Sequence, residues 1–413
     1  MQTLIHNIKA IVGCHAKEVL LVKGRGMKDL PILENAWLLM EDDRILNMGT
    51  GTPPEGTFEQ IDAGNGFVFP TWVDSHTHIV YAGNREGEFV DRINGLTYEE
   101  IARRGGGILN SAAKLRLASE DELIEAALNR LTNVTKTGTG AVEIKSGYGL
   151  TIDAELKMLR VARKLAQLQP LPIRTTLLGA HALPLEYKGN KSGYIQLVCE
   201  EMIPRAAEEG LADYIDIFCE EGYFDVADTE RVLEAGAKWG LKPKTHVNQF
   251  NAIGGVKASV ERGAISVDHL EELEDDDIDV LIGSGTIATA LPLCSLFLTI
   301  PYTPARRLIA AGVPVAIATD YNPGSSPSGN MSLAVALACM KMRMNPEEAI
   351  NAATINGAAA LEWSDQMGSM TLGKKASFFI TREMTSYAYL PYSFGDNLIS
   401  RVFVNGKLVA TNS

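Results

Sequence analysis

The chain has 413 residues, more than one hydrophobic core usually supports, so we expect one large domain and a smaller companion. Hydrophobic residues make up 46% and charged residues 22%, as in soluble globular proteins, which leaves little room for a long disordered tail. The formal net charge of -13 repels phosphate backbones and anionic lipids, so nucleic acid and membrane surfaces are not expected as partners.

Two further features predict a cytoplasmic protein. No apolar run approaches the roughly 18 residues of a membrane span, and the first residues lack a basic stretch followed by an apolar one. The five cysteines are far apart and form no CxxC pair, which suits a reducing compartment. They are Cys14, Cys199, Cys219, Cys294 and Cys339.

The first sixty residues alternate short apolar runs with turn residues, which predicts a small antiparallel sheet. From Gly66 onward, apolar runs are followed by amphipathic helical stretches, and this alternation indicates βα units on a parallel sheet. The runs expected to form strands are 67–78, 139–149, 173–181, 214–222, 242–248, 264–270, 286–292 and 313–320. Eight strands with intervening helices over about 250 residues predict an α/β fold, a (β/α)8 TIM barrel.

After the last of these strands, residues 332–344 and 345–363 are typical of two more helices, the second beginning with Asn345 as cap and Pro346. The tail then turns to β-structure, with strands expected at 376–382 and 398–412 and a hairpin turn at Asn405-Gly406. Neither terminal segment has enough strands to be stable alone. We therefore expect a small β-sandwich-like domain built from residues 1–66 and 374–413, and a barrel over residues 67–373.

Five of the seven histidines fall at or near the carboxyl ends of predicted strands, the face on which barrel active sites lie. They are His76, His78, His181, His246 and His269. His76 and His78 are two residues apart, so on a strand both imidazoles project to the same side and could bind one cation. The alternative is a structural histidine pair, but buried imidazoles each need their own polar partner, which makes packing a poor explanation for five of them.

His246 and Asp320 end the fifth and eighth predicted strands and could supply a third nitrogen and a carboxylate oxygen to the same ion. Such a set leaves room for a water whose pKa falls from about 15.7 towards 7. Asp320 is then the expected proton acceptor, and His269 could hydrogen-bond the water or the developing oxyanion. His269 could instead be a core histidine with Asp268 as its partner. Nitrogen and oxygen ligands suit zinc or iron, and spacing does not choose between them.

The order of the motifs resembles that of the imidazolonepropionase family. The runs that carry the resemblance are VDSHTHIVYAGNREGEF, EIKSGYGL, LLGAHALP, HVNQFNAIGG, VDHLEEL and ATDYNPGSSP, which span residues 73–327. GSMTLGKKASFF is similar to the C-terminal strand motif of the wider amidohydrolase superfamily. The resemblance implies an enzyme that opens the lactam ring of 4-imidazolone-5-propanoate to give N-formimidoyl-L-glutamate, a step of histidine breakdown.

The resemblance also implies roles for individual residues. The implied ligands of one divalent or trivalent metal ion per subunit are His76, His78, His246 and Asp320. The implied substrate-binding residues are Arg85 for the propanoate, Tyr148 and His181 for the ring, and Asn322, Gly324 and Ser325 for the product carboxylate. Gln249 falls where family members carry Glu or Gln; because an amide cannot remove a proton, it is expected to orient the ring. The implied catalytic residues are Asp320, His269 and Gln249.

Simpler explanations stay open for several of these residues. Arg85 could form a surface ion pair with Glu86 or Glu88, Tyr148 could be an aromatic at the rim, and residues 322–325 could be only a tight turn. Two other classes of protein also stay open: another amidohydrolase, such as a deaminase of a cyclic amidine, and a non-catalytic scaffold. A homodimer acting on a small molecule is the expected assembly.

Overall fold

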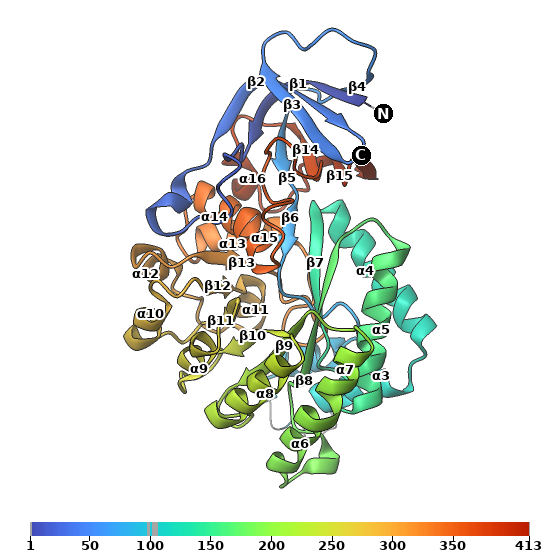
Figure 1. Cartoon of the computed structure of the whole chain (residues 1–413), viewed down its shortest axis with the longest axis vertical. Coiled ribbons are helices and arrows are strands. Elements are labelled where there is room, and N and C mark those ends of the chain that lie inside the picture. The colour runs from blue at the N-terminus through green and yellow to red at the C-terminus, as the bar shows by residue number, and fades with distance from the viewer. Residues whose placement is uncertain (1, 97–99, 101–105, 413) are drawn as a thin grey trace.

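The computed structural model describes residues 2–96, 100 and 106–412. Figure 1 shows two parts: a sheet that contains both termini, and a barrel of parallel strands surrounded by helices. The predicted combination of a (β/α)8 barrel with a small β domain from both ends of the chain is confirmed. Among the described residues, no helix has the length and apolar character needed to cross a bilayer.

The terminal sheet has eight strands in the order β16-β15-β14-β5-β1-β2-β3, with β4 paired to β1. Its strands are β1 (Gln2–Val12), β2 (Ile32–Glu41), β3 (Arg44–Thr50), β4 (Glu59–Asp62), β5 (Gly66–Pro70), β14 (Phe378–Glu383), β15 (Ile399–Val404) and β16 (Lys407–Thr411). β5 joins the two ends of the chain, because it pairs parallel to β1 and antiparallel to β14. Asn405 and Gly406 connect β15 to β16 with φ of 49° and 76°, the left-handed values of the predicted hairpin turn.

The barrel strands follow one another in chain order, each parallel to the next. They are β6 (Trp72–Asp74), β7 (Thr139–Lys145), β8 (Ile173–Ala180), β9 (Tyr214–Cys219), β10 (Lys242–Val247), β11 (Ser266–His269), β12 (Ile287–Ala290) and β13 (Val315–Ile317). The first and last strands meet just beyond their carboxyl ends. There the amide of Asp320 donates to the carbonyl of His76 (3.0 Å), and that of His78 donates to the carbonyl of Tyr321 (2.9 Å). The barrel therefore closes at predicted site residues.

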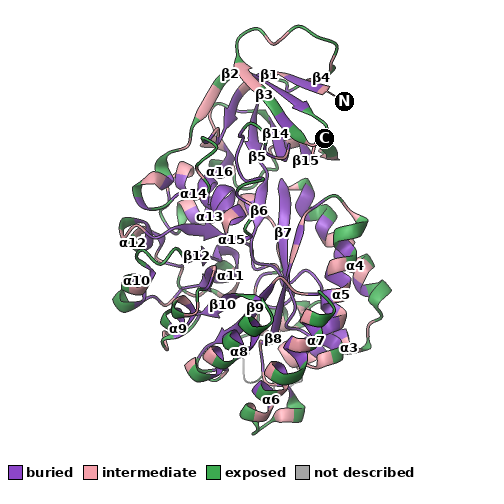
Figure 2. Cartoon of the chain, viewed as in Figure 1, coloured by how far each residue is buried: buried purple, intermediate pink, exposed green. Residues whose placement is uncertain are grey.

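Helices cover the outside of the barrel, with their exposed faces toward solvent and the strands buried (Figure 2). The helices of the described residues are α1 (Glu86–Ile93), α3 (Ile108–Leu117), α4 (Glu120–Lys136), α5 (Ile152–Leu168), α6 (Lys191–Leu197), α7 (Ile203–Glu208), α8 (Val226–Lys238), α9 (Gly255–Glu261), α10 (Asp275–Leu281), α11 (Pro292–Leu298), α12 (Ala305–Ala310), α13 (Met331–Met340), α14 (Pro346–Ala353), α15 (Ile355–Ala360) and α16 (Tyr389–Tyr392), the last of which packs on α13. Capping boxes begin several of them, including α14, where the amide of the predicted cap Asn345 donates to Oε2 of Glu348 (2.7 Å).

Two segments differ from the sequence prediction. Residues 67–78, expected as one strand, form β5 in the terminal sheet and β6 in the barrel, with the chain passing between the two at Thr71. Pro70 ends β5 because proline cannot donate a hydrogen bond to a sheet. Residues 345–363, expected as one helix, are divided into α14 and α15 at Thr354, whose φ and ψ of -121° and -90° are not helical.

Candidate metal centre

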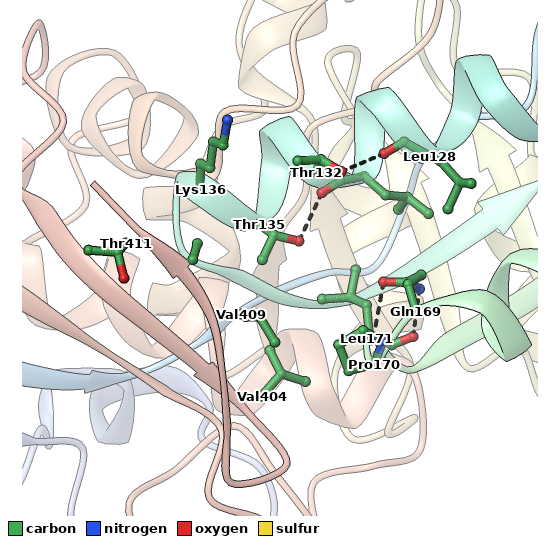
Figure 3. Close-up of a pocket in the computed structure, with 12 residues that line it drawn as sticks. Leu128, Thr132, Thr135, Lys136, Gln169, Pro170, Leu171, Val404, Val409 and Thr411 are labelled. Atoms are coloured by element: carbon green, nitrogen blue, oxygen red, sulfur yellow. Dashed lines mark hydrogen bonds between the residues drawn. The ribbon is translucent and has the colours of Figure 1, made fainter. Parts of the chain in front are cut away.

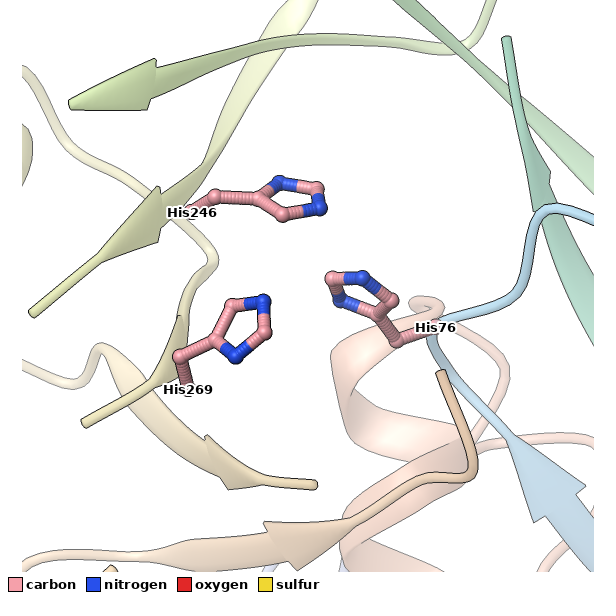
Figure 4. Close-up of side chains that lie close together, drawn as sticks. All are labelled: His76, His246 and His269. Atoms are coloured by element: carbon pink, nitrogen blue, oxygen red, sulfur yellow. The ribbon is translucent and has the colours of Figure 1, made fainter. Parts of the chain in front are cut away.

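The carboxyl end of the barrel holds a buried cluster of four imidazoles and one carboxylate. His76 and His78 follow β6, His246 lies on β10, His269 ends β11, and Asp320 follows β13. All are at most 3% exposed. One nitrogen or oxygen of His76, His78 and Asp320 lies within 4.8 Å of the others, and the same holds for His76, His246 and His269. Figure 4 shows the last three imidazoles turned toward one another from separate parts of the barrel.

The carboxylate lies between the first two imidazoles. Oδ1 of Asp320 is 3.5 Å from Nε2 of His76 and 3.6 Å from Nε2 of His78. The ring of His246 has its centroid 4.4 Å from that of His76 and 5.6 Å from that of His78. The structure thus brings together the four side chains that the sequence suggests as metal ligands.

The hydrogen bonds of His76 and His246 fit a bound cation. Nδ1 of His76 donates to Asp268 (2.7 Å), and Nδ1 of His246 donates to Asp216 (2.9 Å). The Nε2 atom of each ring is buried and has no hydrogen-bond partner among the residues that the structure describes. Burial, and then nearby positive charge, hold the pKa of both imidazoles well below the usual value, so both rings are neutral. Two lone pairs therefore face the cluster without a proton to bind them, as metal coordination requires.

His78 has the same arrangement. Its Nδ1 donates to the carbonyl of Ser146 (3.1 Å), and because a carbonyl can only accept, Nε2 carries the lone pair that faces Asp320. Its ring stacks on that of His181, with centroids 5.4 Å apart and planes at 10°. Tyr148 packs edge-on against both rings and is 4% exposed. Tyr148 is therefore buried against the cluster and is not an aromatic of the rim.

The backbone at two residues of the cluster is in the left-handed region, with φ of 88° at His269 and 54° at Asp320. Such values are unusual for residues other than glycine and concentrate at functional sites. Burial raises the pKa of Asp320 to about 6, although the nearby His269 and the hydroxyl of Ser325, which donates to Oδ2 (3.2 Å), lower it. His269 differs from the other imidazoles, because the carboxylates of Glu271 and Asp320 outweigh the effect of burial and raise its pKa. Nδ1 of His269 lies 3.4 Å from Glu271.

Arg85 lies beside the loop that follows Asp320. A Cβ atom at Gly324 would collide with the Arg85 guanidinium, so glycine leaves the room that Arg85 occupies. The loop is also a tight turn, since Oδ1 of Asn322 accepts from the amides of Gly324 and Ser325, both at 2.8 Å. Arg85 forms the ion pair that was the alternative for it, with Nη2 2.6 Å from Oε2 of Glu88. The half-buried guanidinium nevertheless lies beside Gly324, in the loop that is predicted to bind the product carboxylate.

Gln249 reaches the same centre from β10. Its Nε2 donates to Sγ of Cys294 at the start of α11 (3.4 Å), and the Cys294 thiol in turn contacts Asp320. Cys294 is also fully buried among apolar residues, in one cluster with Leu291 and Ala318. The five cysteines carry no disulfide.

Sequence reasoning missed most of a set of buried charges below the imidazoles; it considered only Asp268, as a partner of His269, whereas Asp268 accepts from His76 in the structure. These residues are Glu143, Lys145, Asp216, Lys244 and Asp268, all 0% exposed. Burial lowers the pKa of the Lys145 ammonium, but the neighbouring carboxylates outweigh this effect and raise the pKa above the usual value. The one signal in the sequence is a charged residue inside an apolar strand, as in AVEIKSG and YIDIF.

A surface pocket of about 290 Å³ lies elsewhere, between α4 and the β15–β16 hairpin (Figure 3). Leu131, Leu171 and Val404 line it together with Thr135 and Lys136, and its lining contains no histidine and no carboxylate. It therefore lacks the imidazole and carboxylate groups that form the cluster at the barrel end.

Comparisons with known proteins agree on one group of enzymes. The sequence model of the amidohydrolase family matches residues 67–409. The chain is 59% identical to an imidazolonepropionase from Christiangramia forsetii and 56% identical to one from Flavobacterium johnsoniae. Each match covers 99% of this chain and 100% of the relative.

Solved structures share the fold at much lower identity. An amidohydrolase from an environmental sample of the Sargasso Sea is 20% identical, with a TM-score of 0.70 over 100% of this chain and 93% of its own. An adenosine deaminase from Xanthomonas campestris with bound zinc is 15% identical, with a TM-score of 0.70 over 98% of this chain and 92% of its own. At these identities the likeness concerns the fold alone.

Proposed function

The chain belongs to the imidazolonepropionase family of the amidohydrolases, and from this premise we propose that it hydrolyses 4-imidazolone-5-propanoate to N-formimidoyl-L-glutamate. It is a hydrolase that cleaves the carbon–nitrogen bond of a cyclic amide in histidine degradation. The observation that supports the proposal most is the buried pair of unpartnered Nε2 atoms, on His76 and His246, in one cluster with the Asp320 carboxylate.

His76, His78, His246 and Asp320 would hold one metal ion per subunit, zinc or iron, because both ions accept imidazole and carboxylate ligands. When bound, such an ion lowers the pKa of a water and polarises a carbonyl group. The neutral imidazoles keep their lone pairs for it, and the closed barrel end excludes bulk water from the ligands.

Asp320 and His269 are the proposed proton-handling residues. Asp320 accepts a proton from the attacking water as the new carbon–oxygen bond forms, and returns it to the ring nitrogen as the carbon–nitrogen bond breaks. The carboxylates around His269 favour its protonated form, which can donate a hydrogen bond to the oxyanion. The amide of Gln249 is neither acid nor base, so we assign to it the orientation of the ring.

The remaining residues would bind the substrate. Arg85 supplies the local positive charge that a propanoate needs in a protein of net charge -13. Tyr148 and His181 would pack on the imidazolone ring. The loop of Asn322, Gly324 and Ser325 would receive the carboxylate of the product, beside the Arg85 guanidinium.

The test is to incubate the purified protein with freshly prepared substrate, follow the loss of the ring's ultraviolet absorption, and identify the product by its mass. Metal content is measured on the same sample. His76→Ala should lose both metal and activity, whereas His15→Ala should keep both, because His15 is a buried histidine bound to Asn351 (2.9 Å) outside the cluster. An active His76→Ala protein without metal would refute the mechanism. Release of ammonia from a purine or pyrimidine, with no effect on the imidazolone, would identify a deaminase instead.

A further inference from the structure

Among the described residues, a linked cluster of five charged side chains lies in the barrel interior below the imidazoles, where such barrels usually pack branched apolar residues. Two are cations and three are carboxylates: Lys145, Lys244, Glu143, Asp216 and Asp268. Removing each charge from water costs several kcal/mol, and ion pairing often does no more than offset this cost. Stability alone is therefore a weak explanation for the cluster.

Lys145 connects three of these groups. Its Nζ lies 2.8 Å from Oε1 of Glu143, 2.8 Å from Oδ2 of Asp216 and 3.5 Å from Oδ2 of Asp268. Lys244 lies on the other side of Glu143, binding Oε2 of that carboxylate and the carbonyl of Ser75 (3.0 Å). Lys145 is thus the cation that Asp216 and Asp268 share.

These two aspartates also orient the two imidazoles whose Nε2 atoms are unpartnered. Oδ2 of Asp216 accepts from Nδ1 of His246, and Oδ2 of Asp268 accepts from Nδ1 of His76. The second oxygen of each carboxylate is held as well. Oδ1 of Asp216 accepts from the amide of His246 (3.1 Å), and Oδ1 of Asp268 accepts from the hydroxyl of Ser266 (2.6 Å). With both oxygens bound, neither carboxylate is free to rotate.

We propose that Asp216 and Asp268, joined through Lys145, are positioning residues that fix the proton on Nδ1 and the ring orientation of His246 and His76. Both Nε2 lone pairs are then directed at one point before a cation arrives. The ammonium of Lys145 would repel a metal cation, so its position near the proposed metal site needs an explanation. Its presence is explained by its contacts with the carboxylates, which would otherwise repel each other. The inference rests on the proposed function, because it assigns these residues to the metal centre of that reaction.

Asp216→Asn is the sharpest perturbation. Both oxygens of Asp216 accept hydrogen bonds, so an amide nitrogen in either place would face a donor. Glu143→Gln is the matched control: it removes the same charge from the same buried cluster, but Glu143 contacts lysines and the Thr176 hydroxyl rather than an imidazole. As at Asp216, an amide nitrogen in either place would face a donor, here the ammonium of Lys145 or Lys244, so the two variants differ in whether an imidazole is among the partners.

The measurement is the affinity of the metal-stripped proteins for Zn²⁺, by competition with a chromophoric chelator, together with the visible spectrum of the Co²⁺-loaded proteins. We expect Asp216→Asn to bind about 10- to 100-fold more weakly and to show an altered Co²⁺ spectrum. Glu143→Gln should stay close to the wild type in both. Unchanged affinity in Asp216→Asn, or an equal loss in both variants, would overturn the proposal, since the second result would be an effect of charge alone.

A measurement on the wild type keeps the proposal testable if Asp216→Asn does not fold. In protein labelled with ¹⁵N-histidine, NMR should find the proton of His76 and His246 on Nδ1, both with and without Zn²⁺, and the signals are assigned from the single alanine variants. A proton on Nε2 of either ring in the metal-free protein would refute the inference. If the wild type binds no Zn²⁺ or Co²⁺, the proposed function fails as well; if it binds them and hydrolyses the substrate while Asp216→Asn behaves identically, only this inference fails.

Discussion

Arg85→Met tests whether the half-buried guanidinium beside Gly324 recognises the substrate carboxylate. A hydrogen bond to a charged group contributes about 1.5 to 3 kcal/mol, which corresponds to roughly 10- to 150-fold in a binding constant. The ion pair with Glu88 does not cancel this loss, because Glu88 stays in the variant and its charge then faces the propanoate alone. The carboxylate of the propanoate takes no part in the bonds that form and break, so the loss falls on binding of substrate and transition state alike. KM should therefore rise by that factor, with kcat little changed.

The assay is the initial rate of ultraviolet absorption loss over a wide range of substrate concentration. Arg92→Met is the control, because Arg92 lies on α1, the helix that directly follows Arg85, but stacks on the ring of Phe297, 4.7 Å from its centroid. An analogue in which the propanoate is replaced by a neutral chain should be hydrolysed equally by wild type and Arg85→Met. A fall in kcat at unchanged KM, or an equal rise of KM in Arg92→Met, would refute the assigned contact.

Three further outcomes are expected. Gly324→Ala should raise KM much as Arg85→Met does, with an unchanged circular dichroism spectrum, because the added methyl group takes the space of the guanidinium. Burial lowers the pKa of Lys374 to about 8, so the folded chain binds fewer protons than the unfolded chain between pH 8 and 10.5. Over that pH range the unfolding free energy of the wild type, measured by urea denaturation, should rise by up to about 3 kcal/mol relative to that of Lys374→Met, and a difference that does not change with pH would contradict this. Phe403→Ala should lower the unfolding free energy by about 3 to 5 kcal/mol, because Phe403 is buried and stacks on Phe378 at 4.8 Å; a loss under about 1 kcal/mol would show that the terminal sheet contributes little to the fold.

The imidazoles could be found from sequence because a barrel places the carboxyl ends of its strands at one face. A polar residue after each apolar run, such as His246 or Asp320, is enough to identify that face without knowing the tilt of the strands. The passage at Thr71 could not be found in this way. Apolar residues stand on both sides of Pro70 and Thr71, and only pairing with Phe378 and its neighbours assigns β5 to the terminal sheet.

The buried charges could not be predicted from the sequence for a different reason. On β7, Glu143 and Lys145 alternate with Val142 and Ile144, and such alternation normally indicates a sheet with one face in solvent. In a closed barrel both faces are covered. Val142 and Ile144 of β7 pack in the hydrophobic core with residues of α4 and α5, whereas Glu143 and Lys145 lie in the barrel interior. Sequence alone does not distinguish that interior from water.

The layering of the barrel accounts for how the interior charges meet the imidazoles. Side chains that fill such barrels form layers drawn from alternate strands. Lys145, Asp216 and Asp268 come from β7, β9 and β11, which are alternate strands, while His76 and His246 come from β6 and β10, which belong to the other set. The carboxylates and imidazoles therefore belong to different layers, and each hydrogen bond between them joins one layer to the next. A substitution that displaces Lys145, Asp216 or Asp268 should consequently change the orientation of both His76 and His246, even though Asp216 contacts only His246.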